Sequence, residues 1–289
     1  MKQRVITALA LLVLLVVVVW QIYTPVFIAV IAFFSVVAAY EIMKCARIKN
    51  RFLLYGGMLL ALIIPLFSQA SILEPVISTQ YWSDVINFVP KSVYLILIVI
   101  FFFISMLVDY ENTKFEDVAI SIVASILVPY GFSVFGKLRD INGYKTQFGI
   151  YLVFFALICA LGTDVGAQLG GMKFGKTKLS PKISPKKTVE GAVCGIIASI
   201  ILNAVALTLY NYLAKVPLTN KQITAVMIMV PIISVFGMLG DLTASVLKRN
   251  FDTKDFGNIF PGHGGVMDRF DSTLFTIPLT YAFTMLVLN

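Results

Sequence analysis

The sequence predicts an all-α, polytopic integral membrane protein with about nine transmembrane helices, a cytoplasmic N-terminus and a C-terminus outside. Of the 289 residues, 59% are hydrophobic and only 13% are charged, whereas soluble domains carry about 25% charged residues. The apolar residues gather in runs close to the length of about 20 residues that a helix needs to cross a bilayer. The Lys and Arg residues concentrate in alternate loops, as the positive-inside rule describes.

Apolar runs account for most of the chain. They cover residues 5–22, 25–43, 52–68, 92–108, 118–136, 148–170, 189–213, 222–240 and 272–288. Helices are expected because every backbone polar group must find its partner within the span, and the alternation of a β-barrel is absent. The first run is expected to be retained, because no small-residue cleavage site follows it.

Positive charge sets the expected orientation. With the N-terminus inside, 17 of the 23 Lys and Arg residues fall on the inner side and 6 on the outer side. The net charge of +8 therefore reflects membrane orientation, and nucleic acid is not an expected partner. Cys45, Cys159 and Cys194 form no CxxC pair and are expected to pack as small side chains.

The two halves of the chain differ in character. Residues 1–147 are expected to form helices 1–5 with short loops, and residues 148–289 to form a catalytic membrane region. Two polar segments, 171–188 and 248–271, interrupt this second region, and both are expected in the cytoplasm. Acidic residues flank them in or near the membrane, and intramembrane acids are usually functional.

The second polar segment carries residues at helical spacing. Asp241, Ser245 and Lys248 are separated by four and then three positions, which places them on one helix face. Asp268 and Asp271 are expected to share a face at the start of the last helix. Carboxylate oxygens suit Mg²⁺, which binds through one or two carboxylates plus substrate phosphates. Any one of these residues has a simpler explanation as a helix-end charge, but the whole set favours a site.

Glycine and lysine mark both polar segments. The stretch Pro-Gly-His-Gly-Gly at 261–265 permits positive φ angles and close backbone approach to a phosphate. The glycines of residues 162–171 allow a helix to pack closely or to open near Asp164. The lysines of 173–187 are expected to bind phosphate as point cations, or alternatively anionic headgroups in general. No GxxxxGK[ST] pattern is present, so no P-loop is predicted.

The order of these motifs resembles the signature of the phosphatidate cytidylyltransferase family, also called CDP-diglyceride synthetases. The final motif comprises Ser245-Val246-Leu247-Lys248-Arg249, Lys254-Asp255, Pro261-Gly262-His263-Gly264-Gly265 and Asp268-Arg269-Phe270-Asp271. Similar to the family's second motif are Ser184-Pro185-Lys186-Lys187-Thr188 and Glu190-Gly191. The resemblance covers the chain from residue 161 to residue 275. One departure is Gln168, where the family commonly has Tyr; it bears on the substrate pocket.

The resemblance implies a reaction and its participants. CTP and phosphatidic acid would give CDP-diacylglycerol and pyrophosphate, with Mg²⁺ as the usual metal and K⁺ as an assisting ion. The protein would be a homodimer among membrane lipids. Separately, its first span fits insertion into a bacterial plasma membrane, and the charge distribution predicts an active site that faces the cytoplasm. Metal binding is expected of Asp241, Asp268 and Ser245. Catalytic roles are expected of Lys248, Arg249, His263, Arg269 and Asp271. Substrate binding is expected of Asp164, Lys176, Ser184, Lys186, Lys187, Thr188, Glu190, Gly264 and Gly265.

The expected chemistry needs charge neutralisation more than a base. Phosphatidate is a phosphate monoester whose second pKa is about 6, so its attacking oxygen is ionised at neutral pH. His263 is then expected to donate a hydrogen bond to phosphate, with a structural turn residue or a general base as alternatives. A CTP-dependent lipid-alcohol kinase would need such a base, and a CDP-alcohol phosphotransferase would need the missing DGxxAR pattern. An ion-coupled transporter using the membrane acids is the alternative from another class, although no inverted repeat is apparent.

Overall fold

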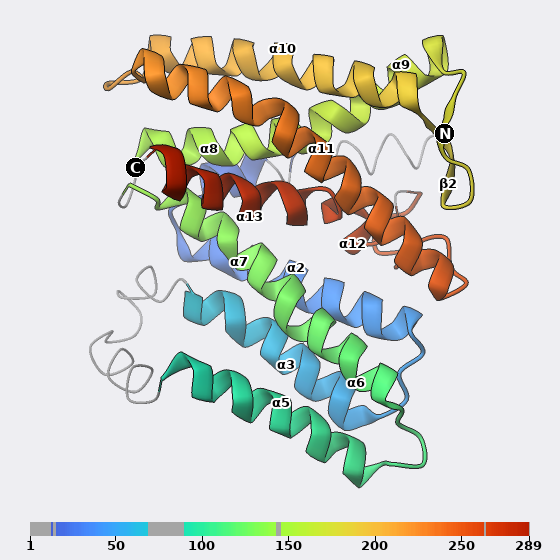
Figure 1. Ribbon diagram of the computed structural model, residues 1–289. Coiled ribbons are helices and arrows are strands. Elements are labelled where there is room, and N and C mark those ends of the chain that lie inside the picture. The colour runs from blue at the N-terminus through green and yellow to red at the C-terminus, as the bar shows by residue number, and fades with distance from the viewer. Residues whose placement is uncertain (1–12, 14–15, 69–89, 143–145, 263, 289) are drawn as a thin grey trace. The chain divides into compact units, whose positions relative to one another are not determined.

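The chain is mostly helical, which agrees with the predicted fold class (Figure 1). The computed structural model describes residues 13, 16–68, 90–142, 146–262 and 264–288. Within these described residues, six helices are long and apolar enough to cross a membrane: Pro25–Cys45, Arg51–Ser68, Phe115–Arg139, Gln147–Phe174, Val189–Leu213 and Asn220–Asn250. Shorter apolar helices cover Ser92–Val108 and Thr273–Val287. The predicted run 5–22 lies mostly outside the described residues, so the count of nine and the side of each terminus stay predictions.

The chain forms two compact units, and each is described by itself. The first comprises Met1–Gly136 and Asp255–Asp268, and the second comprises Lys137–Lys254 and Arg269–Asn289. This grouping differs from a division at residue 147, because a loop from the C-terminal half folds onto the N-terminal helices. Sequence order therefore does not separate the units.

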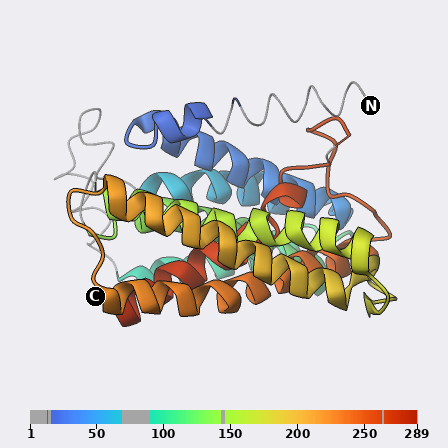
Figure 2. The same cartoon turned by 90° about the horizontal axis from the view of Figure 1, so that it is seen from above.

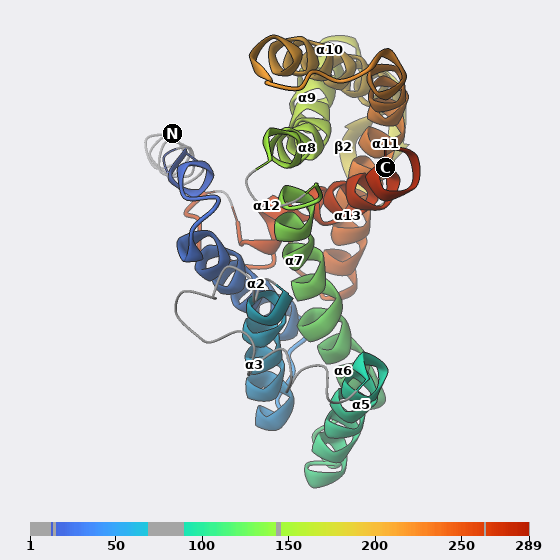
Figure 3. The same cartoon turned by 90° about the vertical axis from the view of Figure 1, so that its left-hand side faces the viewer.

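Most of the described residues of the first unit fall in four helical segments, the last of which continues into the second unit. They are α2 (Pro25–Cys45), α3 (Arg51–Ser68), α5 (Lys91–Val108) and α6 (Phe115–Ile122), which continues as η2 (Val123–Leu127) and α7 (Val128–Arg139). Leu53 on α3, Phe102 on α5 and Val118 on α6 are buried in one hydrophobic cluster. Figure 3 shows α5 next to α6. Asn50 joins α3 to α5, since its Oδ1 accepts from the N–H of Phe52 at 2.8 Å and its Nδ2 donates to the carbonyl of Ser105 at 2.8 Å.

In the second unit, one long helical segment comprises α8 (Gln147–Leu157), the π-helical turn η3 (Ile158–Gly162) and α9 (Thr163–Phe174). Helix α10 (Val189–Leu213) lies along α9 (Figure 2). Small residues permit this approach: a Cβ on Gly170 would lie 2.2 Å from Cys194 Cβ, and one on Gly195 would lie 2.6 Å from the Thr163 carbonyl oxygen. The close packing expected of these glycines is confirmed.

A β-hairpin joins α9 to α10 and was not anticipated from the sequence. Strands β1 (Lys178–Ser180) and β2 (Ser184–Thr188) pair antiparallel, with Ser180 opposite Ser184. Strand β2 ends at Thr188, which caps α10 because its Oγ1 accepts from the N–H of Gly191 at 3.1 Å. The hairpin therefore enters the helix with a fixed geometry.

The last two elements correct one expectation. Helix α11 (Asn220–Asn250) is continuous, so Asp241, Ser245 and Lys248 do share a helix as predicted. The final helix does not begin at Asp268. Instead α12 (Met267–Phe270) is a single turn, a turn follows at Asp271, and α13 (Thr273–Phe283) then continues as η4 (Thr284–Leu288).

Candidate active site

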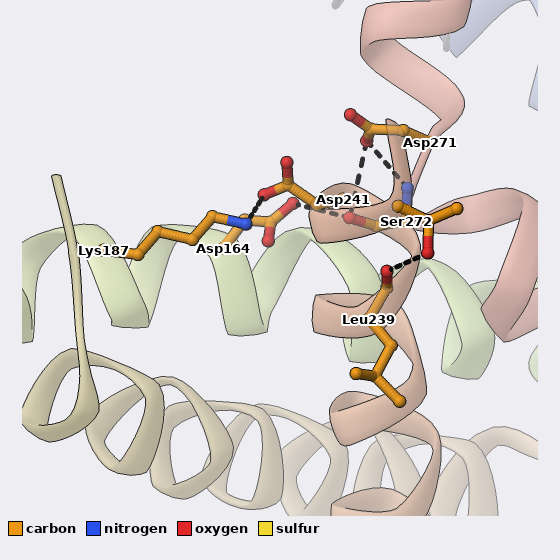
Figure 4. A network of polar contacts seen from close by, with 7 residues as sticks. Asp164, Lys187, Leu239, Asp241, Asp271 and Ser272 are labelled. Carbon is orange, nitrogen blue, oxygen red and sulfur yellow. Dashed lines mark hydrogen bonds and ion pairs between the residues drawn. The ribbon is translucent and has the colours of Figure 1, made fainter. Parts of the chain in front are cut away.

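Three aspartates of the second unit meet from three separate elements (Figure 4). Asp164 lies on α9, Asp241 on α11, and Asp271 in the turn before α13. The Nζ of Lys187, on β2, lies 2.5 Å from Asp241 Oδ2. Ser272 joins the other two aspartates: its Oγ donates to Asp164 Oδ2 at 3.3 Å, and its N–H donates to Asp271 Oδ1 at 2.7 Å. We call these five residues the aspartate cluster.

Local structure determines the direction of the side chains in the aspartate cluster. The π-helical turn η3 ends immediately before α9, and such turns frequently mark functional sites. Successive side chains of a strand point to opposite faces. This alternation explains why Lys187 reaches Asp241 while Lys186 beside it is exposed. The cap by Thr188 fixes the end of that strand.

The aspartate cluster concentrates negative charge in a partly buried place. Asp164 and Asp241 are half-buried, and Asp271 is 9% exposed. Burial first, and the neighbouring Asp241 carboxylate second, raise the pKa of Asp271 to about 7, whereas the Ser272 N–H and Lys248 act in the opposite direction. The mutual repulsion of these carboxylates favours the binding of a cation among them.

The donor chemistry of the aspartate cluster fits Mg²⁺. No three Asp, Glu, His or Cys side chains within the described parts of the chain converge into a complete metal site. Mg²⁺ does not require such a cage, because it usually keeps several waters and binds through one or two carboxylates plus substrate phosphates. The carboxylate of Asp241, paired with a cationic side chain that substrate phosphate could attract away, meets this requirement.

Two of the cations predicted to act on phosphate, Lys248 and Arg269, interact with the cluster. Lys248, two turns after Asp241 on α11, interacts electrostatically with Asp271. Arg269 interacts in the same way with Asp164. Arg249 is exposed at the end of α11, and its Nη1 donates to the Thr253 carbonyl at 3.5 Å. Ser245 is half-buried on the same helix as Asp241.

The other predicted metal ligand, Asp268, organises a loop in the first unit. Its Oδ2 accepts from the N–H groups of Phe256 at 2.8 Å and Gly265 at 3.0 Å. Gly262 and Gly264 have φ angles of 76° and 86°, which confirms the positive φ expected of this glycine-rich turn. His263, between them, lies outside the described residues, so its role stays a prediction.

Several predicted substrate-binding residues build the hairpin. The carboxylate of Glu190 accepts from the N–H groups of Lys176 at 3.0 Å and Thr177 at 3.1 Å. Lys176, Lys186 and Gln168 are exposed, and Ser184 is half-buried. Glu190 therefore holds the backbone that leads into the hairpin, and Thr188 caps α10. The substrate contacts of all these residues stay predictions.

Glu41 is a buried acid that the sequence analysis did not select. It lies near the end of α2, is 3% exposed, and accepts from the N–H groups of Val266 and Met267. The sequence did contain a signal for Glu41: a carboxylate within the apolar run 25–43. Charged groups are costly there and are usually functional. The distance of Glu41 in sequence from every motif hid its connection to the glycine-rich loop.

An apolar cavity of the second unit lies apart from the aspartate cluster. Its volume is about 420 Å³, and α8, η3 and α10 line it with side chains that include Tyr151 and Tyr210. None of the cluster residues lines it. The candidate active site is therefore assigned from the polar contacts of the aspartate cluster and not from this cavity.

The described residues thus combine helices long and apolar enough to cross a membrane with a polar cluster of carboxylates, a lysine and a serine, an arrangement typical of a membrane protein with a functional polar site. The model of the cytidylyltransferase family matches residues 2–287, and the chain belongs to that family. It is 35% identical over 286 residues to the phosphatidate cytidylyltransferase of Bacillus subtilis, covering 97% of this chain and 96% of that protein. Proteins of the same name from Staphylococcus haemolyticus and Staphylococcus saprophyticus are 32% and 33% identical over 166 residues, covering 57% of this chain and 58% of each relative. The chain is thus a nucleotidyltransferase of the membrane.

Proposed function

We propose that this protein converts CTP and phosphatidic acid into CDP-diacylglycerol and pyrophosphate. The observation that carries the proposal is the near full-length match to a phosphatidate cytidylyltransferase, joined to a cluster of three carboxylates and a lysine on the elements that bear the motifs. A transporter would not need the family's phosphate-binding motifs. A lipid-alcohol kinase would need a general base for its hydroxyl nucleophile.

The reaction is an in-line displacement at phosphorus. An ionised phosphatidate oxygen forms a bond to the α-phosphorus of CTP, and the bond from that phosphorus to the pyrophosphate oxygen breaks. The obstacle is the repulsion between two anions, so positioning and charge neutralisation supply the catalysis. Lys187, Lys248 and Arg269 are the proposed neutralising residues. A bound Mg²⁺ would neutralise the phosphates and the pyrophosphate leaving group.

The ion pair between Lys187 and Asp241 suggests how the site accepts its substrates. Lys187 neutralises Asp241 in the structure. A triphosphate would offer Lys187 a stronger partner, and the Asp241 carboxylate would then be one of the groups that hold Mg²⁺. Asp268 and Ser245 are proposed as further ligands, and Asp271 as a supporting carboxylate. K⁺ and a homodimer remain parts of the proposal that rest on the family resemblance.

The orientation of the site follows from charge. The distribution of Lys and Arg favours a cytoplasmic location for residues 173–187 and 248–271, which is where CTP is available in a bacterial cell. The membrane is then the plasma membrane. Single-cysteine labelling at exposed Asn258 in sealed vesicles tests this placement. Labelling only from outside would contradict both the orientation and the use of cytosolic CTP.

The direct test of function uses the purified protein in mixed micelles with CTP, phosphatidic acid and Mg²⁺. CDP-diacylglycerol and pyrophosphate should form in equal amounts, and chelation of the metal should stop the reaction. Asp241→Asn provides the matched inactive protein. Formation of CDP together with a phosphorylated lipid alcohol, or ion transport without nucleotide turnover, would refute the proposal.

A further inference from the structure

Glu41 has an environment unlike that of a passive buried acid. Its two carboxylate oxygens bond separately, with Oε1 accepting from the Val266 N–H at 3.1 Å and Oε2 from the Met267 N–H at 2.9 Å. These donors lie more than 220 positions away in sequence and belong to the same compact unit. Met267 begins α12, whose first N–H groups have no partner within the helix. Glu41 therefore caps this turn from another helix.

Two glycines make room for this carboxylate. A Cβ on Gly257 would lie 2.1 Å from Glu41 Oε1, and a Cβ on Gly265 would lie 2.3 Å from the same atom. Any side chain at either position would displace the carboxylate or the loop. The glycine at 265 thus serves the approach of Glu41 as well as the turn.

The segment that Glu41 holds also contains Asp268. Asp268 accepts from the N–H groups of Phe256 and Gly265, so the two carboxylates together bind four N–H groups along one loop. Cys45, one helical turn after Glu41, donates through Sγ to the Phe256 carbonyl at 3.2 Å. Helix α2 is consequently hydrogen-bonded to both ends of the loop from residue 256 to residue 267.

We propose that Glu41 is a positioning residue for this reaction, which fixes the loop that carries Asp268 and leads into Arg269. The inference rests on the proposed function, because it assumes that this loop takes part in cytidylyl transfer. It assigns a role to helix α2, which carries none of the recognisable motifs. In this proposal the binding of the phosphatidate headgroup does not depend on Glu41, whereas the alignment of the reacting groups does.

The test compares Glu41→Gln, Glu41→Ala and the control Ser35→Ala. Glutamine keeps the volume but offers one acceptor oxygen, so one N–H faces an NH₂ group. Ser35 is buried on the same helix and donates to the Ile31 carbonyl within that helix. A misplacement of about 1 Å can cost about 10²-fold in rate. We expect kcat to fall about tenfold in Glu41→Gln and about 10²-fold in Glu41→Ala, with an unchanged KM for phosphatidate and a near-normal control.

Two further measurements do not depend on turnover alone. Hydrogen exchange without substrates should be faster at the amides of Val266 and Met267 in both Glu41 variants and unchanged in Ser35→Ala. Gly257→Ala should lower kcat in the parent and have a smaller effect in Glu41→Ala, because the clashing oxygen is gone.

Unchanged exchange at Val266 and Met267 in Glu41→Ala would overturn the proposal, as would faster exchange with full kcat. A raised KM for phosphatidate with normal kcat would also overturn it. A parent protein that forms no CDP-diacylglycerol refutes the proposed function instead, and the exchange experiment separates these two failures. If Glu41→Ala does not fold, Glu41→Gln still decides between the outcomes.

Discussion

Two groups of buried or half-buried carboxylates in this protein have different partners. In the first unit, Glu41 and Asp268 accept hydrogen bonds from backbone N–H groups of one loop. In the second unit, Asp164, Asp241 and Asp271 face one another, a lysine and a serine (Figure 4). Backbone donors are fixed by the fold, whereas a lysine side chain can exchange partners. Acids are costly in membrane proteins in general, and the second arrangement, with its exchangeable lysine partner, is the better suited of the two to binding an incoming ligand.

The largest effect is expected at Asp241. Asp241→Asn removes a charge that would hold the metal, and metal stabilisation of the transition state is worth several kcal/mol. We expect kcat to fall by about 10³-fold while the protein remains folded, as judged by size-exclusion chromatography in detergent. Asp252→Asn, at an exposed position with positive φ that Asn tolerates, is the matched control. If Asp241→Asn retained most of the parent activity at saturating Mg²⁺, Asp241 would not be a metal ligand.

A substitution at Asp268 tests whether this residue only holds the loop or also binds the metal. Asp268→Asn keeps an oxygen that can accept from the loop, but it removes the negative charge. If Asp268 is also a metal ligand, as proposed, we expect a fall of about 10²-fold in kcat with near-normal hydrogen exchange at Phe256 and Gly265. A fall of less than about threefold would place Asp268 with Glu41 as a residue that only holds the loop.

The two adjacent lysines of β2 provide a matched pair. Lys187→Ala removes the partner of Asp241 and a proposed phosphate contact, and about 1.5–3 kcal/mol is typical of a hydrogen bond to a charged group. We expect about a 10- to 10²-fold loss of kcat/KM for CTP. Lys186→Ala, on the exposed face of the same strand, should change kcat/KM less than about twofold. Equal losses in both variants would indicate general attraction of anions rather than a specific contact.

The smallest effect is expected at His263. If phosphatidate attacks in its ionised form, His263→Gln should retain activity within about tenfold of the parent, because a hydrogen-bond donor remains. Loss of a general base typically costs about 10²–10⁴-fold. The rate should rise with pH through about 6, where the second phosphate proton dissociates, in both proteins. Disappearance of that acidic limb in the variant, with a large loss of rate, would show that histidine acts as a base.

Local sequence patterns were sufficient for the helical elements and for part of the site. Hydropathy over about 20 residues predicted the long apolar helices that the structure describes, and helical spacing predicted that Asp241, Ser245 and Lys248 share α11. The glycine-rich turn was recognisable because positive φ is a local property. The order of the polar motifs was enough to indicate the family that the full-length comparison confirms.

Only the tertiary structure placed Asp164, Lys187, Asp241 and Asp271 in one cluster and joined Glu41 to the glycine-rich loop. Hydropathy and periodicity describe how a residue relates to neighbours within a few turns, so they are silent on partners that lie tens or hundreds of positions away. The β-hairpin and the break between α12 and α13 escaped prediction for a related reason. Each depends on contacts such as those of Glu190 with Thr177 and of Ser272 with Asp164, which form only when separate segments pack. The sequence by itself thus determined the membrane-spanning fold and the kind of chemistry, whereas packing decided which carboxylates face a ligand and which hold the chain.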